Sequence, residues 1–110
     1  MKLPFKIDLT GKVAAITGGA GVLCSAFAHA LAACGASVAI IDRNEESGNA
    51  VVADIQSEGG RALMVKADCL DPDSLKAAHD VVVREFGPVD ILVNGAGGNN
   101  PRATTDNEYY

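Results

Sequence analysis

The sequence predicts an α/β fold with a doubly wound parallel sheet, and three observations support this prediction. Short apolar runs of strand length alternate with longer helical segments along most of the 110 residues. A glycine-rich turn at 18–21 joins the first apolar run to the first helical segment. The acid Asp42 ends the second apolar run, about 20 residues after that turn. This order is typical of folds that hold a phosphate at a helix N-terminus.

The first half of the chain is predicted to form two strands, each followed by a helix. We expect strands at 13–17 and 37–42 and helices at 22–34 and 44–58. Ala, Leu and Phe surround most of the first helix, so we expect that helix to be deeply buried. Gly35 and the pair Gly59-Gly60 are natural ends for the two helices.

The second half is predicted to form a strand, a helix and a strand. The expected bounds are 62–67, 72–86 and 89–94. Asp71 and Pro72 supply an N-cap and a first-turn proline for the helix, and Gly87-Pro88 ends it. The last strand is a continuous apolar run, which is typical of a buried parallel strand.

Right-handed crossovers place the first two helices on one face of the sheet. The sequence alone does not determine where the fourth strand lies. In the doubly wound, Rossmann-like arrangement it returns beside the first strand, which gives the order 3-2-1-4, three αβα layers and the third helix on the opposite face. The glycine clusters 18–21 and 95–98 would then meet at the crevice where ligands bind.

The turn at 19–24 reads G-x-G-x-x-C, a nucleotide-binding pattern with Cys24 in the last glycine position. Such a pattern alone also suits any tight turn, but within a β-α-β unit that ends in Asp42 it predicts phosphate binding. Cys24 could be a thiolate activated by the helix N-terminus. We favour the simpler interpretation that it is a small residue packed against the sheet.

Asp42 could cap the helix at 44–58 or accept the hydroxyls of an adenosine ribose. Its place at the end of the second strand, followed by Arg43, favours ribose recognition. A carboxylate repels a 2′-phosphate, so the sequence predicts NAD in preference to NADP. Arg43 could partly offset that preference.

Several other polar residues have open interpretations. Asp68 could contact adenine or bond its own turn, and Asn94 could contact a cofactor or bridge strands. His29 and His79 lie within predicted helices and are expected to be packing or surface residues. The sequence contains no recognisable Ser/His/Asp or Cys/His constellation, so we predict neither a metal site nor a catalytic residue.

Composition excludes several classes of function. A formal charge of −5 and the absence of a basic run argue against nucleic-acid binding. No apolar stretch has the length of a membrane span, and residues 1–6 lack the apolar core of a secretory signal. An odd number of cysteines, Cys24, Cys34 and Cys69, fits free thiols in a reducing cytoplasm.

Four segments together resemble the classical short-chain dehydrogenase/reductase family. They are 9–19, Asp42, 67–68 and 90–97, in the family's order and spacing. The segments 97–101 and 103–105 resemble the subset of D-mannonate/fructuronate oxidoreductases, which act on sugar acids. Two departures stand out. Val22 and Cys24 occupy the last two glycine positions of the family's loop, and Gly95 replaces an amide side chain.

The resemblance implies NAD(P)-dependent hydride transfer between an alcohol and a ketone of a small molecule, here a sugar acid. It implies that residues 18–23 hold the pyrophosphate, Asp42 the adenosine ribose and Asp68-Cys69 the adenine. It implies that residues 94–97 support the sheet and the nicotinamide-side ribose. The implied cofactor-binding residues are Gly18, Gly19, Gly21, Val22, Leu23, Asp42, Arg43, Asp68, Cys69, Asn94, Gly95, Ala96 and Gly97.

The family's catalytic Ser and Y-x-x-x-K would lie beyond Tyr110, and Thr105 to Glu108 has the form of a helix-starting capping box. We therefore expect residues 1–110 to be the N-terminal part of a longer dinucleotide-binding domain, inactive alone, whose full-length form is a homo-oligomer. One alternative is a non-catalytic dinucleotide-binding module. Another is an S-adenosylmethionine methyltransferase, against which the segment 94–97 argues.

Overall fold

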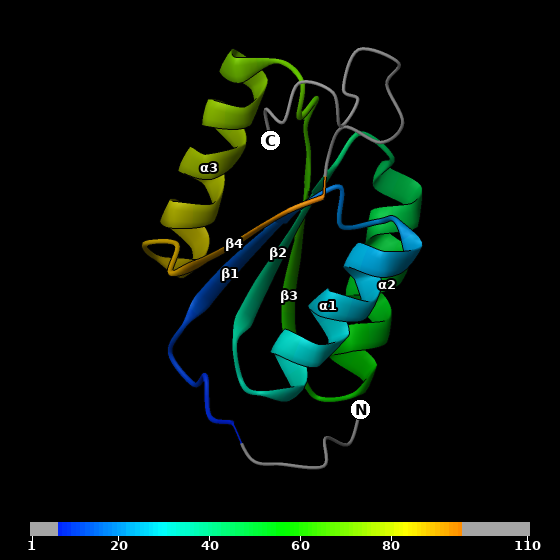
Figure 1. Ribbon diagram of the computed structural model, residues 1–110, viewed down its shortest axis with the longest axis vertical. Helices are drawn as coiled ribbons and strands as arrows, with labels where there is room; N and C mark the ends of the chain where they lie inside the picture. Colours follow the sequence, from blue (N-terminus) through cyan, green and yellow to red (C-terminus); the bar gives the residue numbers. More distant parts are fainter. Residues whose placement is uncertain (1–6, 96–110) are drawn as a thin grey trace, which may run out of the picture.

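The computed structural model describes residues 7–95, which form four strands and three helices in strict alternation (Figure 1). The elements are β1 (Val13–Thr17), α1 (Val22–Ala33), β2 (Ser37–Asp42), α2 (Glu45–Ser57), β3 (Arg61–Lys66), α3 (Pro72–Phe86) and β4 (Ile91–Asn94). The helix ends follow the predicted glycines, since Gly35 and Gly59 have φ angles of 100° and 86°. Only glycine adopts such angles at little cost.

The sheet is entirely parallel with the order β3-β2-β1-β4, which confirms the predicted return of the fourth strand beside the first. Thr17, at the end of β1, pairs with Ile41 of β2 on one side and with Asn94 of β4 on the other. The glycine turn after β1 and the chain after β4 therefore leave the same edge of the sheet, at a topological switch point.

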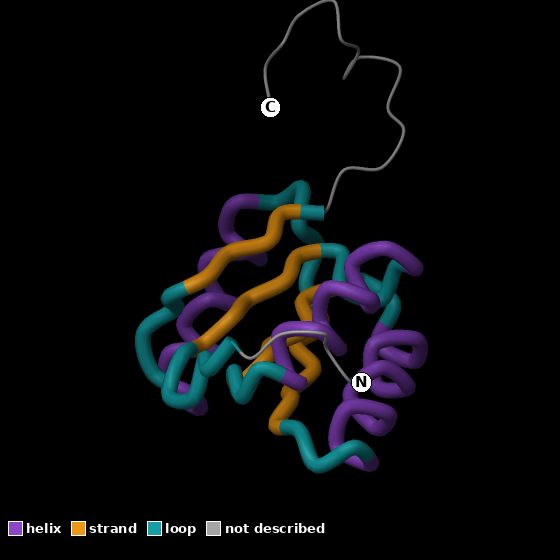
Figure 2. The backbone as a smooth tube through the Cα atoms, turned by 60° about the horizontal axis from the view of Figure 1, so that its bottom comes forward, coloured by secondary structure: helices purple, strands orange, loops and turns teal. Residues whose placement is uncertain are grey.

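Helices cover both faces of the sheet, and the strands lie between them (Figures 1 and 2). On one face, Ile16 and Ile40 pack with Cys24 and Ala28 of α1 and with Ile55 of α2. Alternate strand residues point to the opposite face, where they pack against Ala78 and Val82 of α3. Burial on both faces explains why β1 is apolar up to Thr17.

The prediction that α1 is deeply buried is wrong for the described part of the chain. Only Cys24 and Ala28 of this helix are buried, whereas Val22, Leu23 and Phe27 are 92%, 70% and 47% exposed. The helix packs against the sheet through a narrow stripe, and the small residues in that stripe hold it close to β1 and β2. Its broad apolar surface therefore does not indicate burial on all sides.

The last two strands differ from the predicted bounds. The third strand begins and ends one residue earlier, at Arg61–Lys66, and β4 begins only at Ile91. Asp90, just before β4, makes two hydrogen bonds with Val13, the first residue of β1. Its carboxylate accepts from Val13 N at 2.9 Å, and its own N–H donates to Val13 O at 2.9 Å. A side-chain oxygen thus replaces a strand carbonyl, and regular pairing starts one residue later.

Within residues 7–95, no helix has both the length and the apolar character needed to cross a membrane.

Candidate functional site

The turn between β1 and α1 is tight and lies directly against β2. Gly18 has a φ of +70°, and its N–H donates to Ile41 O at 2.7 Å. Gly21 N then donates to Gly18 O at 3.1 Å, which closes the turn. A Cβ atom on Gly19 would lie 2.9 Å from Ile40 Cγ2, so only glycine fits there without a shift. The glycines therefore let the backbone pass closely over the end of the sheet.

The N-terminus of α1 has no side-chain cap. Its N-cap residue, Gly21, has extended backbone angles and accepts no hydrogen bond through a side chain, and the first turn contains no acidic residue. The first N–H groups of a helix have no partner within the helix and carry a partial positive charge. This N-terminus can therefore accept an anionic group such as a phosphate.

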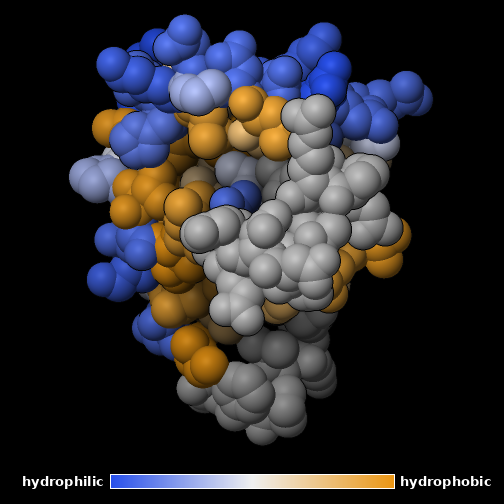
Figure 3. Space-filling view, turned by 45° about the horizontal axis from the view of Figure 1, so that its top comes forward, coloured by the Kyte–Doolittle hydropathy of each residue, from blue (hydrophilic) through white to orange (hydrophobic). Residues whose placement is uncertain are grey.

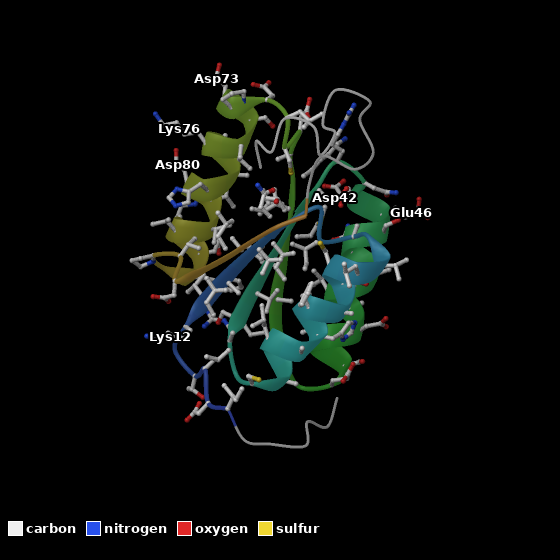
Figure 4. All side chains as sticks on the ribbon, viewed as in Figure 1. Lys12, Asp42, Glu46, Asp73, Lys76 and Asp80 are labelled. Carbon is white, nitrogen blue, oxygen red and sulfur yellow. The ribbon has the colours of Figure 1, made fainter. Side chains whose placement is uncertain are left out.

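Asp42 connects the glycine turn to the start of α2 (Figure 4). Its Oδ2 accepts a hydrogen bond from Ala20 N at 3.1 Å, and its Oδ1 accepts one from Asn44 N at 2.9 Å. The N-cap of α2 is Asn44, whose side chain accepts from Ser47 N at 3.0 Å. The alternative interpretation of Asp42 as the cap of this helix is therefore wrong.

A cavity of about 220 Å³ opens at this end of the sheet and brings together residues that are far apart in the sequence. Its lining comes from the turn after β1, the end of β2, the segment after β3 and the end of β4. The lining residues are Gly18, Asp42, Arg43, Asp68, Cys69, Leu70 and Gly95. Six of these seven are predicted cofactor-binding residues. Val22 and Leu23 instead lie exposed on the first turn of α1.

Asp68 makes the turn interactions that one interpretation predicts. Its Oδ1 accepts from Leu70 N at 3.0 Å, and its N–H donates to Ser74 Oγ at 2.9 Å. A second, polar cavity of about 500 Å³ lies beside it, between Arg43, Lys66 and Ser74. A role of Asp68 toward adenine stays a prediction.

Cys69 is partly buried and lies near the carboxylates of Asp42 and Asp68. Burial raises the pKa of its thiol above the ordinary 9.0, and the negative charges of Asp42 and Asp68 raise this pKa further, against the lowering effect of a hydrogen bond from the Gly18 backbone. Its Sγ lies 3.7 Å from Ile41 O. The thiol is therefore held in its neutral form at ordinary pH.

The end of β4 is joined to the end of β1. The hydroxyl of Thr17 donates to Asn94 Oδ1 at 2.8 Å, and Gly95 N donates to Thr17 O at 2.9 Å. Asn94 therefore makes the strand-bridging bond that one interpretation predicts, while its contact with a cofactor stays a prediction. The predicted residues Ala96 and Gly97 lie outside the described residues.

An apolar cavity of about 640 Å³ lies on the other face of the sheet, between α3 and the ends of β1 and β4. Leu75, Val82 and Leu92 are among its lining residues, and hydrophobic side chains gather beside the hydrophilic outer surface of α3 in Figure 3. Leu92 is 66% exposed at the edge of the sheet.

The remaining candidates lie apart from the 220 Å³ cavity. His29 Nδ1 is 3.2 Å from Glu58 Oε1, near the opposite end of α1, and His79 is exposed on α3 with Nδ1 3.9 Å from Asp80 Oδ1. The described residues include no group of three or more His, Cys, Asp or Glu side chains that could hold a metal ion.

Sequence reasoning missed three residues that support the site. They are Thr17, Ala20 and Ser74, which bond Asn94, Asp42 and Asp68. Of these three pairs, only Asp68 and Ser74 are close in sequence, and their spacing of six residues is not a distinctive motif.

Comparison with known proteins gives consistent matches along the chain. The family model for short chain dehydrogenases matches residues 12–109. An uncharacterized oxidoreductase, UxuB, of Bacillus subtilis is 53% identical over 108 residues, which are 98% of this chain and 39% of that protein. The 7alpha-hydroxysteroid dehydrogenase of Escherichia coli K12 is 40% identical over 96 residues, which are 87% of this chain and 38% of that protein.

Solved structures show the same fold. The structure of a proposed D-mannonate oxidoreductase from Haemophilus influenza with bound NAD has a TM-score of 0.82 and 43% identity, over 94% of this chain and 37% of that one. A metagenomic short-chain oxidoreductase in complex with NADP has a TM-score of 0.77 and 32% identity, over 91% of this chain and 47% of that one. The chain thus spans about two fifths of the length of the curated relatives it matches.

Proposed function

The chain belongs to the short chain dehydrogenase family, and from this premise we propose that it binds NAD in preference to NADP for hydride transfer between an alcohol and a ketone. The observation that carries the proposal is the uncapped N-terminus of α1 beside Asp42, at the switch point of the parallel sheet. Neighbours of known structure that bind NAD or NADP support a nicotinamide dinucleotide as the cofactor.

In this proposal the pyrophosphate lies against the backbone of the turn from Gly18 to Leu23. The adenosine ribose lies against Asp42. Each carboxylate oxygen of Asp42 already accepts one backbone N–H, and since a carboxylate has about four acceptor sites, about two remain for the ribose hydroxyls. A 2′-phosphate at the same place would meet a negative charge, and this repulsion favours NAD.

The other end of the dinucleotide would extend toward β4, where Asn94 and Gly95 lie. When bound, the nicotinamide ring supplies or accepts the hydride. The described residues bind and orient the cofactor, and we assign no residue of this chain as the group that donates or accepts the proton. The proposed substrate is a sugar acid, which is supported by the neighbour described as a D-mannonate oxidoreductase.

A second candidate is a dinucleotide-binding module without catalysis. It is favoured by one observation, namely that the described residues lining the 220 Å³ cavity include no Ser, His, Tyr or Lys side chain. The two candidates differ in turnover and agree on cofactor binding.

Binding can be tested by titrating the isotopically labelled chain with NAD and following its amide resonances. We expect the largest shifts at the glycine turn and Asp42, and competition by ADP-ribose at similar concentration. NADP should bind more weakly. Shifts confined to α3 would contradict the proposed site.

Turnover should be tested with protein expressed from the complete gene. Absorbance of reduced nicotinamide is followed with a panel of sugar acids, and with steroid alcohols as the control substrates. Reduction of NAD with sugar acids supports the enzyme, whereas NAD binding without turnover on any substrate favours the module. Sedimentation of the same preparation tests the expected homo-oligomer.

A further inference from the structure

Cys24 and Gly95 are in contact although they are 71 residues apart in the sequence. Cys24 is buried in the first turn of α1, and Gly95 directly follows β4. A Cβ atom on Gly95 would overlap the Sγ atom of Cys24, so the sulfur occupies the space that any side chain at position 95 would need. This contact lies between the phosphate-binding turn and the end of β4, which are the two segments at the switch point.

Both residues are departures from the patterns that this sequence otherwise follows. Cys24 stands where the nucleotide-binding pattern has its last glycine, and Gly95 stands where the resemblance leads one to expect an amide side chain. Relative to these patterns, position 24 carries a side chain where glycine is expected, and position 95 lacks the side chain that is expected there. The structure places the Cys24 side chain in the space that a side chain at position 95 would fill.

We infer that Cys24 and Gly95 act as one positioning pair that sets the distance between the glycine turn and the end of β4, and thereby fits the crevice to a dinucleotide. This inference rests on the proposed function. Neither residue is proposed to react. The sulfur acts as a spacer, and a side chain at position 95 would push the end of β4 away from α1.

The local geometry makes the inference specific to the sulfur atom. Gly95 does not have a positive φ, so its backbone conformation admits alanine. A Cβ atom at position 95 would lie 3.6 Å from Cys24 Cβ, which is an ordinary contact, and 3.1 Å from Thr17 O, which is tight. Removing only Sγ should therefore relieve most of the clash, and the contact with Thr17 should leave a small residual cost.

The experiment uses protein expressed from the complete gene and the variants G95A, C24A, C24S, C24A/G95A and C24S/G95A. Alanine at position 24 removes the overlapping atom and is a good helix former, whereas serine keeps an atom at the same place. The variant G48A is a matched packing control, because a Cβ atom on Gly48 would overlap Met64 Sδ between α2 and β3. Dissociation constants for NAD and AMP and the free energy of unfolding are measured for each.

We expect G95A to weaken NAD binding about tenfold, the size typical of coupled neighbours, and to weaken AMP binding much less. The reason is that AMP does not reach toward β4, whereas the second half of NAD does. C24A/G95A should regain NAD affinity to within about threefold of the wild type, and C24S/G95A should stay weak. G48A should lose stability without changing the ratio of NAD to AMP affinity.

Unchanged NAD affinity in G95A, equal losses for NAD and AMP, or equal rescue by serine and alanine would each overturn the inference. If G95A does not fold, a folded C24A/G95A that binds NAD supports the pair, and an unfolded one overturns it. If the wild type binds neither NAD nor AMP, the proposed function fails. In that case the free energies of unfolding test the packing of Cys24 against Gly95 by themselves. This packing requires that G95A be less stable than the wild type and that C24A/G95A regain most of the lost stability.

Discussion

The N-cap residues of the three described helices all have extended backbone angles, but the helices differ in what satisfies their first N–H groups. The helices α2 and α3 begin with side-chain caps, Asn44 accepting from Ser47 N and Asp71 accepting from Asp73 N, both at 3.0 Å. Both also carry acidic residues in the first turn, while α1 has neither feature. The chain thus satisfies two helix N-termini with its own side chains and leaves α1 without a side-chain cap. The uncapped N–H groups of α1 are those that we propose to bind the pyrophosphate.

This difference also explains the position of Asp42. A carboxylate at the N-terminus of α1 itself would compete with a phosphate, whereas Asp42 lies at the end of β2. Its two oxygens accept from Ala20 N in the turn before α1 and from Asn44 N before α2, and neither is an N–H group of α1. Asp42 therefore fixes the glycine turn through Ala20 N and does not cap the first turn of α1. The same acid can therefore organise the loop and recognise a neutral ribose.

The largest effect is expected when α1 is given a cap like that of α3. In Gly21→Asp the new carboxylate should accept the first-turn N–H groups and repel the pyrophosphate, because Gly21 already has the extended conformation of an N-cap. NAD affinity should fall by about 3 kcal/mol, or ~100-fold, while the unfolding free energy rises by about 1 kcal/mol. Calorimetric titration and chemical denaturation measure the two changes.

Gly21→Ala is the matched control for this variant. Its Cβ atom would lie 3.4 Å from Gly18 O, an ordinary contact, and it adds no acceptor. NAD affinity should stay within about threefold of the wild type. An equal loss in the alanine variant would mean that bulk at position 21, and not a cap, is what the site excludes.

A smaller effect is expected at Asp42. In Asp42→Ala the preference for NAD over NADP should fall by about 2 kcal/mol, because a charge-assisted set of hydrogen bonds and a repulsion are lost together. Asp42→Asn keeps an acceptor oxygen without the charge, and should therefore lose the discrimination against NADP while retaining most NAD binding. The two dissociation constants are compared for each variant, and an unchanged ratio would contradict ribose recognition.

Removing the existing caps should affect stability only. Asn44→Ala and Asp71→Ala should each lower the free energy of unfolding by about 1 kcal/mol, because each leaves a first-turn N–H without its partner. NAD affinity should change by less than about twofold, since these helix ends do not receive the pyrophosphate. A larger loss of NAD affinity in either variant would contradict the proposed difference between α1 and the other two helices.

The smallest effect concerns the Cys69 thiol in the candidate cavity. Its raised pKa means that the native state holds the proton more tightly than the unfolded chain, so this group's contribution to stability is complete below pH 9 and is lost as pH rises through the native pKa. Alkylation of Cys69, followed by peptide mass spectrometry, should be slow at neutral pH and should keep accelerating above pH 9.

The urea-unfolded chain provides the reference rate, since its thiol has the ordinary pKa. Asp42→Ala removes one of the negative charges that raise this pKa, so alkylation of the native variant should begin at lower pH than in the wild type. A native rate profile equal to that of the unfolded chain would contradict the partly buried environment of Cys69 beside Asp42 and Asp68.

The bounds of an element could be predicted from the sequence where residues at its ends favour a start or a stop. The bounds of β1, β2 and α3 agree with the prediction. For α3 the reason is that Asp71, Pro72 and Gly87 lie directly at the two ends of the helix. The start of β4 could not be predicted in this way. Val89 is as apolar as the strand residues, but it packs with the core cluster on the α3 side of the sheet. The side chain of Asp90, and not its backbone carbonyl, accepts the hydrogen bond from Val13 N.

The sequence by itself determined the alternation of strands and helices, the glycine turn and the chemical kinds of group at the site. These depend on backbone conformation, hydrophobic pattern and charge, which are properties of short segments. The tertiary structure alone decided which of these groups meet. Three contacts at the site join residues that are far apart in the sequence. Asp42 bonds Ala20 at a separation of 22 residues, Thr17 bonds Asn94 at 77, and Cys24 contacts Gly95 at 71. Such contacts depend on strand order and register, which arise only when the whole sheet assembles.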